Sequence, residues 1–202
     1  KIVEEGDPRR YTDTIGEKWR IAEVAIKPFP SGRASHAVLG TLDEMLRASE
    51  IDAGSVARIE AFVPPLIHRL MTRPVHDGMT ASYARLCLPF LTALMLTDGR
   101  IDPRRFGAAT FADPAIRALA DRFSMVLDDN GDPNALEPQR LVVTLTDGRR
   151  IERHVAHTLG GADAPMSEAQ TRAKRALARE LAPPDADARL FDDPLGYFTE
   201  PK

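Results

Sequence analysis

Residues 27–36 hold the residue types that could carry chemistry in this chain. A lysine, an arginine and a histidine lie within this run, around two prolines and a glycine. Prolines and glycine favour a turn, so the run predicts neither a strand nor a helix. Lysine and arginine bind anions, and the ordinary pKa of histidine lies near neutrality, where the ring can move a proton. The run therefore predicts an anion site. The alternative is a solvated connection with ordinary surface charges.

The elements on either side of this run must position it. Residues 19–26 alternate polar and apolar types over part of their length, which predicts a half-buried strand. Apolar residues recur at helical spacing over 36–47, which predicts an amphipathic helix that begins near Ser35. Free N–H groups and the positive end of the helix dipole face outward at such a helix start, and Lys27 and Arg33 add two cations.

The rest of the chain mixes short strands with helices. Further strands are predicted at 56–63, at 124–127, and in a hairpin of 141–145 and 149–155 around Asp147-Gly148. Further helices are predicted from Thr80 to 98 with a kink or break at Pro89, from Pro114 to 123, and at 168–181 after Ser167. We expect irregular structure at 66–78, and an exposed loop at 128–134, because that acidic run lacks the glutamate that closes an EF-hand.

Composition excludes several classes of protein. The chain has 202 residues, 43% of them apolar, and a net charge of −3 with scattered Lys and Arg, so we expect no nucleic-acid or membrane partner. The apolar run 86–96 is too short to span a bilayer. The single cysteine, Cys87, and the absence of zinc-ligand spacing predict no disulfide, no metal and a cytoplasmic setting. The chain begins with Lys1, and we expect it to be a piece of a larger protein.

Four segments, in order, resemble the C-terminal part of the MmgE/PrpD family, which includes 2-methylcitrate dehydratases, cis-aconitate decarboxylase and an iminodisuccinate epimerase. They are the turn 27–30 with His36 nine residues after its lysine, the segment 84–90 that leads to Asp98-Gly99, the hairpin turn 146–148, and Gly160-Gly161 followed by Pro165-Met166-Ser167 and the Lys174 helix. The first is similar to the family's Lys-Pro-Tyr-Pro…His segment. The match runs from about residue 15 to about residue 182, and the order of the motifs is more specific than any one of them.

The resemblance implies an α+β fold: a lid-type domain with a small, mostly antiparallel sheet packed by helices, flanked by helices that belong to an all-α domain. It divides the chain into a lead-in at 1–18 from an N-terminal helical domain, the C-terminal α+β domain at 19–182, and a tail at 183–202 that could dock on a surface. It also implies a homodimer of the complete protein, and no cofactor.

The family acts on small polycarboxylates and begins by handling a proton on a carbon next to a carboxylate. The resemblance makes Lys27 and His36 the expected catalytic residues: Lys27 would hold a carboxylate or the developing charge, and His36 would move the proton. Ser31, Gly32, Arg33 and Ser35 are the expected substrate-binding residues. Some members have a histidine where this chain has Gly32, and others a tyrosine at Phe90, so a decarboxylase-like chemistry is not implied.

Three interpretations remain open. The first is a cofactor-independent lyase or isomerase that resembles 2-methylcitrate dehydratase and would serve propionate metabolism, of which this chain is the C-terminal part. The second is a stand-alone domain that binds a carboxylate, or a partner protein, without turnover. The third is a dimerisation module that uses the apolar helix 80–96 as its contact surface.

Overall fold

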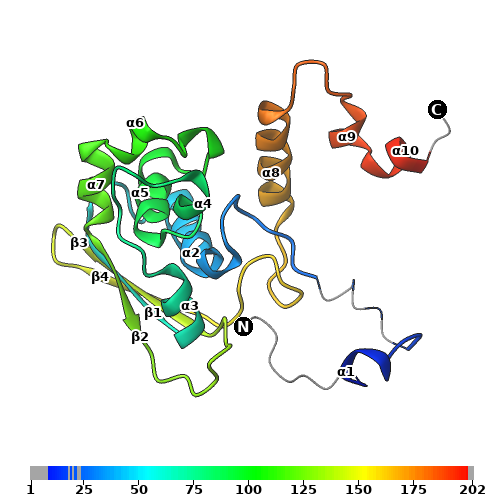
Figure 1. Cartoon of the computed structure of the whole chain (residues 1–202). Coiled ribbons are helices and arrows are strands. Elements are labelled where there is room, and N and C mark those ends of the chain that lie inside the picture. Colours follow the sequence, from blue (N-terminus) through cyan, green and yellow to red (C-terminus); the bar gives the residue numbers. More distant parts are fainter. Residues whose placement is uncertain (1–8, 18, 20, 22–23, 200–202) are drawn as a thin grey trace.

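The fold was analysed in a computed structural model, which describes residues 9–17, 19, 21 and 24–199. A four-stranded sheet forms one layer (Figure 1), in the order β2 (Phe123–Leu127), β1 (Val56–Val63), β3 (Gln139–Leu145), β4 (Arg150–Val155). The β1–β2 pair is parallel, and the β1–β3 and β3–β4 pairs are antiparallel. The strands predicted at 56–63 and 124–127 and the hairpin are confirmed, and Gly148 has the positive φ (87°) that its tight turn requires.

The sheet buries one face. Ile59 and Val63 on β1 are fully buried, whereas their neighbour Arg58 is exposed and pairs with Glu60. This alternation is what a strand with period 2 produces when helices cover one side of the sheet only.

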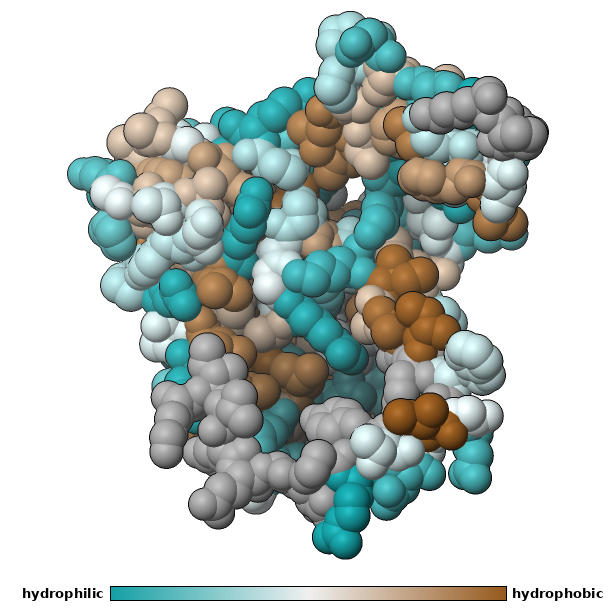
Figure 2. Space-filling model, turned by 45° about the vertical axis from the view of Figure 1, so that its right-hand side comes forward, coloured by the Kyte–Doolittle hydropathy of each residue, from teal (hydrophilic) through white to brown (hydrophobic). Residues whose placement is uncertain are grey.

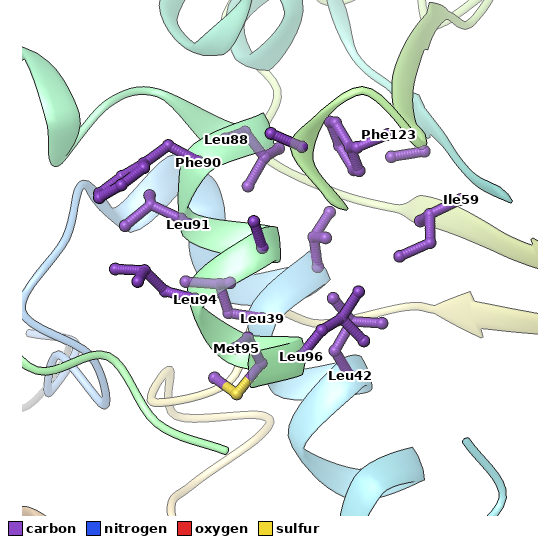
Figure 3. Close-up of a cluster of buried hydrophobic side chains, with 14 of the residues drawn as sticks. Leu39, Leu42, Ile59, Leu88, Phe90, Leu91, Leu94, Met95, Leu96 and Phe123 are labelled. Carbon is purple, nitrogen blue, oxygen red and sulfur yellow. The ribbon is translucent and has the colours of Figure 1, made fainter. Parts of the chain in front are cut away.

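Two helices pack against that face. Figure 3 shows α2 (His36–Arg47) and α5 (Leu88–Asp98) side by side, with Leu39 and Leu42 of α2 in the cluster of buried side chains that also includes Ile59 of the sheet. α5 is apolar on all sides, which fits its burial. Shorter helices complete the layer: α3 (Pro65–Met71), α4 (Ala81–Ala84), α6 (Ala108–Phe111), α7 (Pro114–Ala120) and the 3-10 turns at Arg33–Ser35 and Pro103–Arg105. The result is the predicted α+β domain.

The predicted helix from Thr80 to 98 is two helices. The Thr80 side chain caps α4 by accepting the N–H of Tyr83, and α5 begins anew with Pro89 in its first turn. Proline has no N–H to donate and is tolerated in the first turn of a helix but not in its interior. The helix is therefore interrupted before Pro89, as expected. Gly99 ends α5 in the left-handed conformation (φ 64°).

Two other predictions were wrong. The irregular run at 66–78 includes α3, which begins at Pro65 and buries Ile67 and Met71, because a proline that ends a strand can also start a helix. Residues 20, 22 and 23 of the predicted strand 19–26 lie outside the described residues, but Val24 and Ile26 are exposed and belong to no strand. Among the described residues of this run, the alternation of polar and apolar types therefore does not mark a buried face of the sheet.

The C-terminal helices stand beside the body (Figure 1). Ser167 caps α8 (Glu168–Leu181) in a capping box with Gln170, as predicted. α9 (Arg189–Asp192) contacts α8, and α10 (Pro194–Thr199) follows with Leu195 and Phe198 exposed. At the N-terminal side lies the short α1 (Arg9–Thr12). None of the helices among the described residues has the length and hydrophobicity needed to cross a membrane.

Candidate functional site

The run 27–36 forms the expected turn into a helix. A 3-10 turn at Arg33–Ser35 leads directly into α2 at His36. The Ser31 and Ser35 hydroxyls are buried and lie 2.7 Å apart, and the Ser35 hydroxyl also donates to the Gly32 carbonyl (2.8 Å). In this arrangement both serines bond within the turn and hold it closed.

Gly32 anchors the turn to the body. Its N–H donates to the carbonyl of Arg85 between α4 and α5 (3.0 Å), and a Cβ at this position would lie 2.4 Å from Leu86 Cδ2. A side chain at Gly32 would therefore displace Leu86.

His36 is the buried titratable group of the site. Its ring is 1% exposed and packs edge-on against Phe29, with 5.9 Å between ring centroids. Its Nε2 atom is buried without a hydrogen-bond partner among the described residues. Burial lowers the His36 pKa to about 4; the positive charges of Lys27, Arg33 and Lys174 act in the same direction, and a hydrogen bond with the Ser31 backbone opposes them. The ring is therefore neutral at pH 7 and can accept a proton.

Lys27 and Arg33 present their charges to solvent. Lys27 Nζ lies 3.4 Å from the carbonyl oxygen of Ser31, and no described carboxylate lies within ion-pair distance of either side chain. Two cations that no described carboxylate neutralises, beside a neutral histidine, form a site that favours an anion.

Lys174 is a third cation of the site. It is not among the site residues that the sequence predicted. It extends from α8, and its Nζ donates to the Lys27 carbonyl oxygen at 2.7 Å. The sequence marks Lys174 only as part of a helix that resembles the family, because nothing local indicates which distant segment a surface lysine meets.

The Gly160-Gly161 segment borders the turn as well. Gly160 accepts a hydrogen bond from the N–H of Ile26 (2.8 Å) and has a φ of +91°. A Cβ on Gly160 would lie 2.0 Å from the Ile26 carbonyl oxygen, and one on Gly161 would lie 3.8 Å from the Arg33 guanidinium. The first and the fourth motif of the sequence therefore meet in space.

A pocket of about 310 Å³ lies next to the turn, between it and α8. It is lined by apolar side chains, among them Phe29 and Leu177, and by charged ones, which are Asp43, Arg47, Arg100, Lys174 and Glu180. Lys27, Arg33 and His36 do not line it, so the pocket adjoins the candidate site and is not identical with it.

His157, and Phe90 of the second motif, make contacts outside the candidate site. His157 lies on the surface with its Nδ1 3.2 Å from Glu137, and nowhere in the described ranges do three His, Cys, Asp or Glu side chains gather to hold a metal ion. Phe90 is a core residue that packs edge-on against Phe111.

Comparison with known proteins identifies the domain. A family model described as the MmgE/PrpD C-terminal domain matches residues 29–192. The match includes His36, Gly160 and Lys174 and begins two residues after Lys27, so it starts and ends later than the expected 15–182. A search of curated proteins finds no match. Since the family model covers most of the chain, the protein belongs to the MmgE/PrpD family, whose C-terminal domain it carries.

Proposed function

We propose that this chain is the C-terminal part of a lyase or isomerase that acts on a small polycarboxylate, in the manner of a 2-methylcitrate dehydratase. The observation that carries the proposal is the neutral, buried His36 with an unpartnered Nε2, surrounded by cations that no described carboxylate neutralises. Family membership supports the same assignment.

In the proposed reaction, Lys27 and Arg33 bind the carboxylates of the substrate and stabilise the negative charge that develops when the neighbouring carbon loses its proton. His36, neutral at pH 7, accepts that proton at Nε2. The Ser31 and Ser35 hydroxyls and the Gly32 N–H bond within the chain and shape the turn, and the expected binding of substrate by these residues stays a prediction.

A carboxylate-binding module without turnover is the second candidate. One observation favours it: the charged groups that act on His36 are all cations, so the described residues provide no carboxylic acid to work as its partner in proton transfer.

The test combines binding with proton exchange. Citrate, 2-methylcitrate and cis-aconitate are titrated into the chain by calorimetry, and the same mixtures in D₂O are followed by NMR for exchange of the proton next to a carboxylate. We expect Lys27→Ala to weaken binding about tenfold or more, and His36→Ala to abolish exchange. Arg69→Ala, which removes an exposed cation from α3, is the matched control and should change neither.

The outcomes separate the candidates. Exchange that depends on both Lys27 and His36 supports the enzyme. Binding that depends on Lys27 without exchange supports the binding module. A folded chain that binds none of the three acids contradicts both.

A further inference from the structure

Lys174 meets the turn at the Lys27 carbonyl, which accepts no hydrogen bond from a described backbone N–H. The turn contains Pro28 and Pro30, which have no N–H to donate. No described backbone N–H donates to the Lys27 carbonyl, and the Lys174 ammonium does so at 2.7 Å. This contact joins segments 147 residues apart in the sequence.

α8 holds Lys174 there from a position outside the core. None of its residues is buried. Near its C-terminal end, Glu180 pairs with Arg100 and Arg104, which extend from the segment after α5, and Arg104 also bonds the buried Asp102. Charged contacts at Glu180 and at Lys174 thus fix the helix at two points along its length.

We propose that Lys174 is a positioning residue of this site: it fixes the Lys27 carbonyl, so that the Lys27 side chain stays beside His36, and it adds a positive charge that favours a polycarboxylate ligand. The nature of the ligand rests on the proposed function, whereas the positioning rests on the geometry alone.

The role of Lys174 can be measured without turnover, because Lys174 is one of the charged groups that oppose protonation of His36. Lys27 and Arg33 act from the turn and Lys174 acts from α8, and all three oppose protonation of the ring. Loss of Lys174 removes one charge and releases the carbonyl that keeps Lys27 in place. Both effects let the ring bind a proton more readily.

The experiment titrates the histidine ring protons by NMR in the absence of ligand, with His36 assigned through His36→Gln. We expect Lys174→Met to raise the His36 pKa from about 4 by only part of the shift, because burial and the other two cations still lower it, and to weaken citrate binding about threefold. Arg175→Met removes the neighbouring cation of α8, which does not act on His36, and should leave both unchanged. Lys174→Arg should retain most of the wild-type behaviour, because it keeps both charge and donor.

An unchanged His36 titration in folded Lys174→Met overturns the proposal. If Lys174→Met does not fold, Lys174→Ala replaces it, since alanine also removes both the donor and the charge and favours a helix; an unchanged pKa there has the same meaning. A His36 pKa that depends on Lys174 in a chain that binds no polycarboxylate supports the positioning role and contradicts the proposed function.

Discussion

At the scale of single residues, packing changes what a side chain can do. An isolated histidine has a pKa of about 6.5 and is partly charged at neutral pH. In this fold the His36 ring is buried and packs against Phe29, and the cations around it are also unfavourable for its charged form. Burial, more than any charged neighbour, makes His36 a neutral proton acceptor.

The lowered pKa of His36 makes the stability of the fold depend on pH. The unfolded chain takes up a proton on this histidine near pH 6.5 and the folded chain only near pH 4, so the unfolded state binds more protons between these values. The contribution of His36 to the free energy of unfolding is therefore complete above pH 6.5 and is lost as the pH falls towards 4. Between pH 7.5 and 5 we expect His36 alone to cost about 2 kcal/mol of the free energy of unfolding.

Urea unfolding at the two pH values measures this loss. His36→Gln cannot titrate and is the control: the wild type should lose about 2 kcal/mol more than the variant over this range. Equal losses in the two proteins would show that His36 titrates alike in the folded and the unfolded chain.

At the scale of elements, the site forms where three segments meet. The turn leads into α2, the loop with Gly160 bonds to Ile26 just before the turn, and α8 supplies Lys174. At Gly160, only a glycine fits both the positive φ and the space.

We expect Gly160→Ala to destabilise the domain by about 2 kcal/mol and to weaken citrate binding. The added methyl would strike the Ile26 carbonyl, a backbone atom that cannot move without the turn, and alanine disfavours a φ of +91°. Urea unfolding and calorimetry measure the two effects.

Gly131→Ala is the matched control. Gly131 lies in an exposed loop, and no heavy atom lies within 4 Å of an added Cβ. The free energy of unfolding of Gly131→Ala should therefore stay within about 0.5 kcal/mol of the wild-type value. If Gly160→Ala were as stable as Gly131→Ala, the loop and the turn would not pack as described.

At the scale of the whole molecule, the domain combines a dense core with exposed apolar side chains outside it. The core lies between the sheet, α2 and α5, whereas several large apolar side chains of the terminal segments are exposed to solvent. They are Ile15, Trp19, Ile21, Val24, Ile26, Leu195 and Phe198. Figure 2 shows one face of the molecule, with hydrophobic residues at its surface.

Trp19 reports directly on these exposed residues. It is the single tryptophan of the chain and is 79% exposed. We expect its fluorescence to match that of a solvated indole, with quenching by acrylamide as efficient in the native chain as in urea. A blue-shifted emission that persists on dilution would show that Trp19 is covered within the monomer, contrary to the structure.

Local rules determined much of the fold. Proline and glycine positions, helix caps and hydrophobic periods predicted α2, β1, the hairpin and α8 to within a few residues, because each depends on neighbours in the sequence. The same rules failed for the strand predicted at 19–26, whose described apolar residues Val24 and Ile26 are exposed, and at α3, where a pair of prolines marks the start of a helix as well as the end of a strand.

The sequence by itself also determined the candidate turn, since lysine, arginine and histidine lie close together along the chain, and the order of its motifs indicated the family. The tertiary structure alone decided how those residues act. It buried His36, used the Ser31 and Ser35 hydroxyls within the turn, and brought Gly160 and Lys174 to the site. Desolvation and contacts between distant segments depend on how the whole chain packs, and no local pattern contains that information.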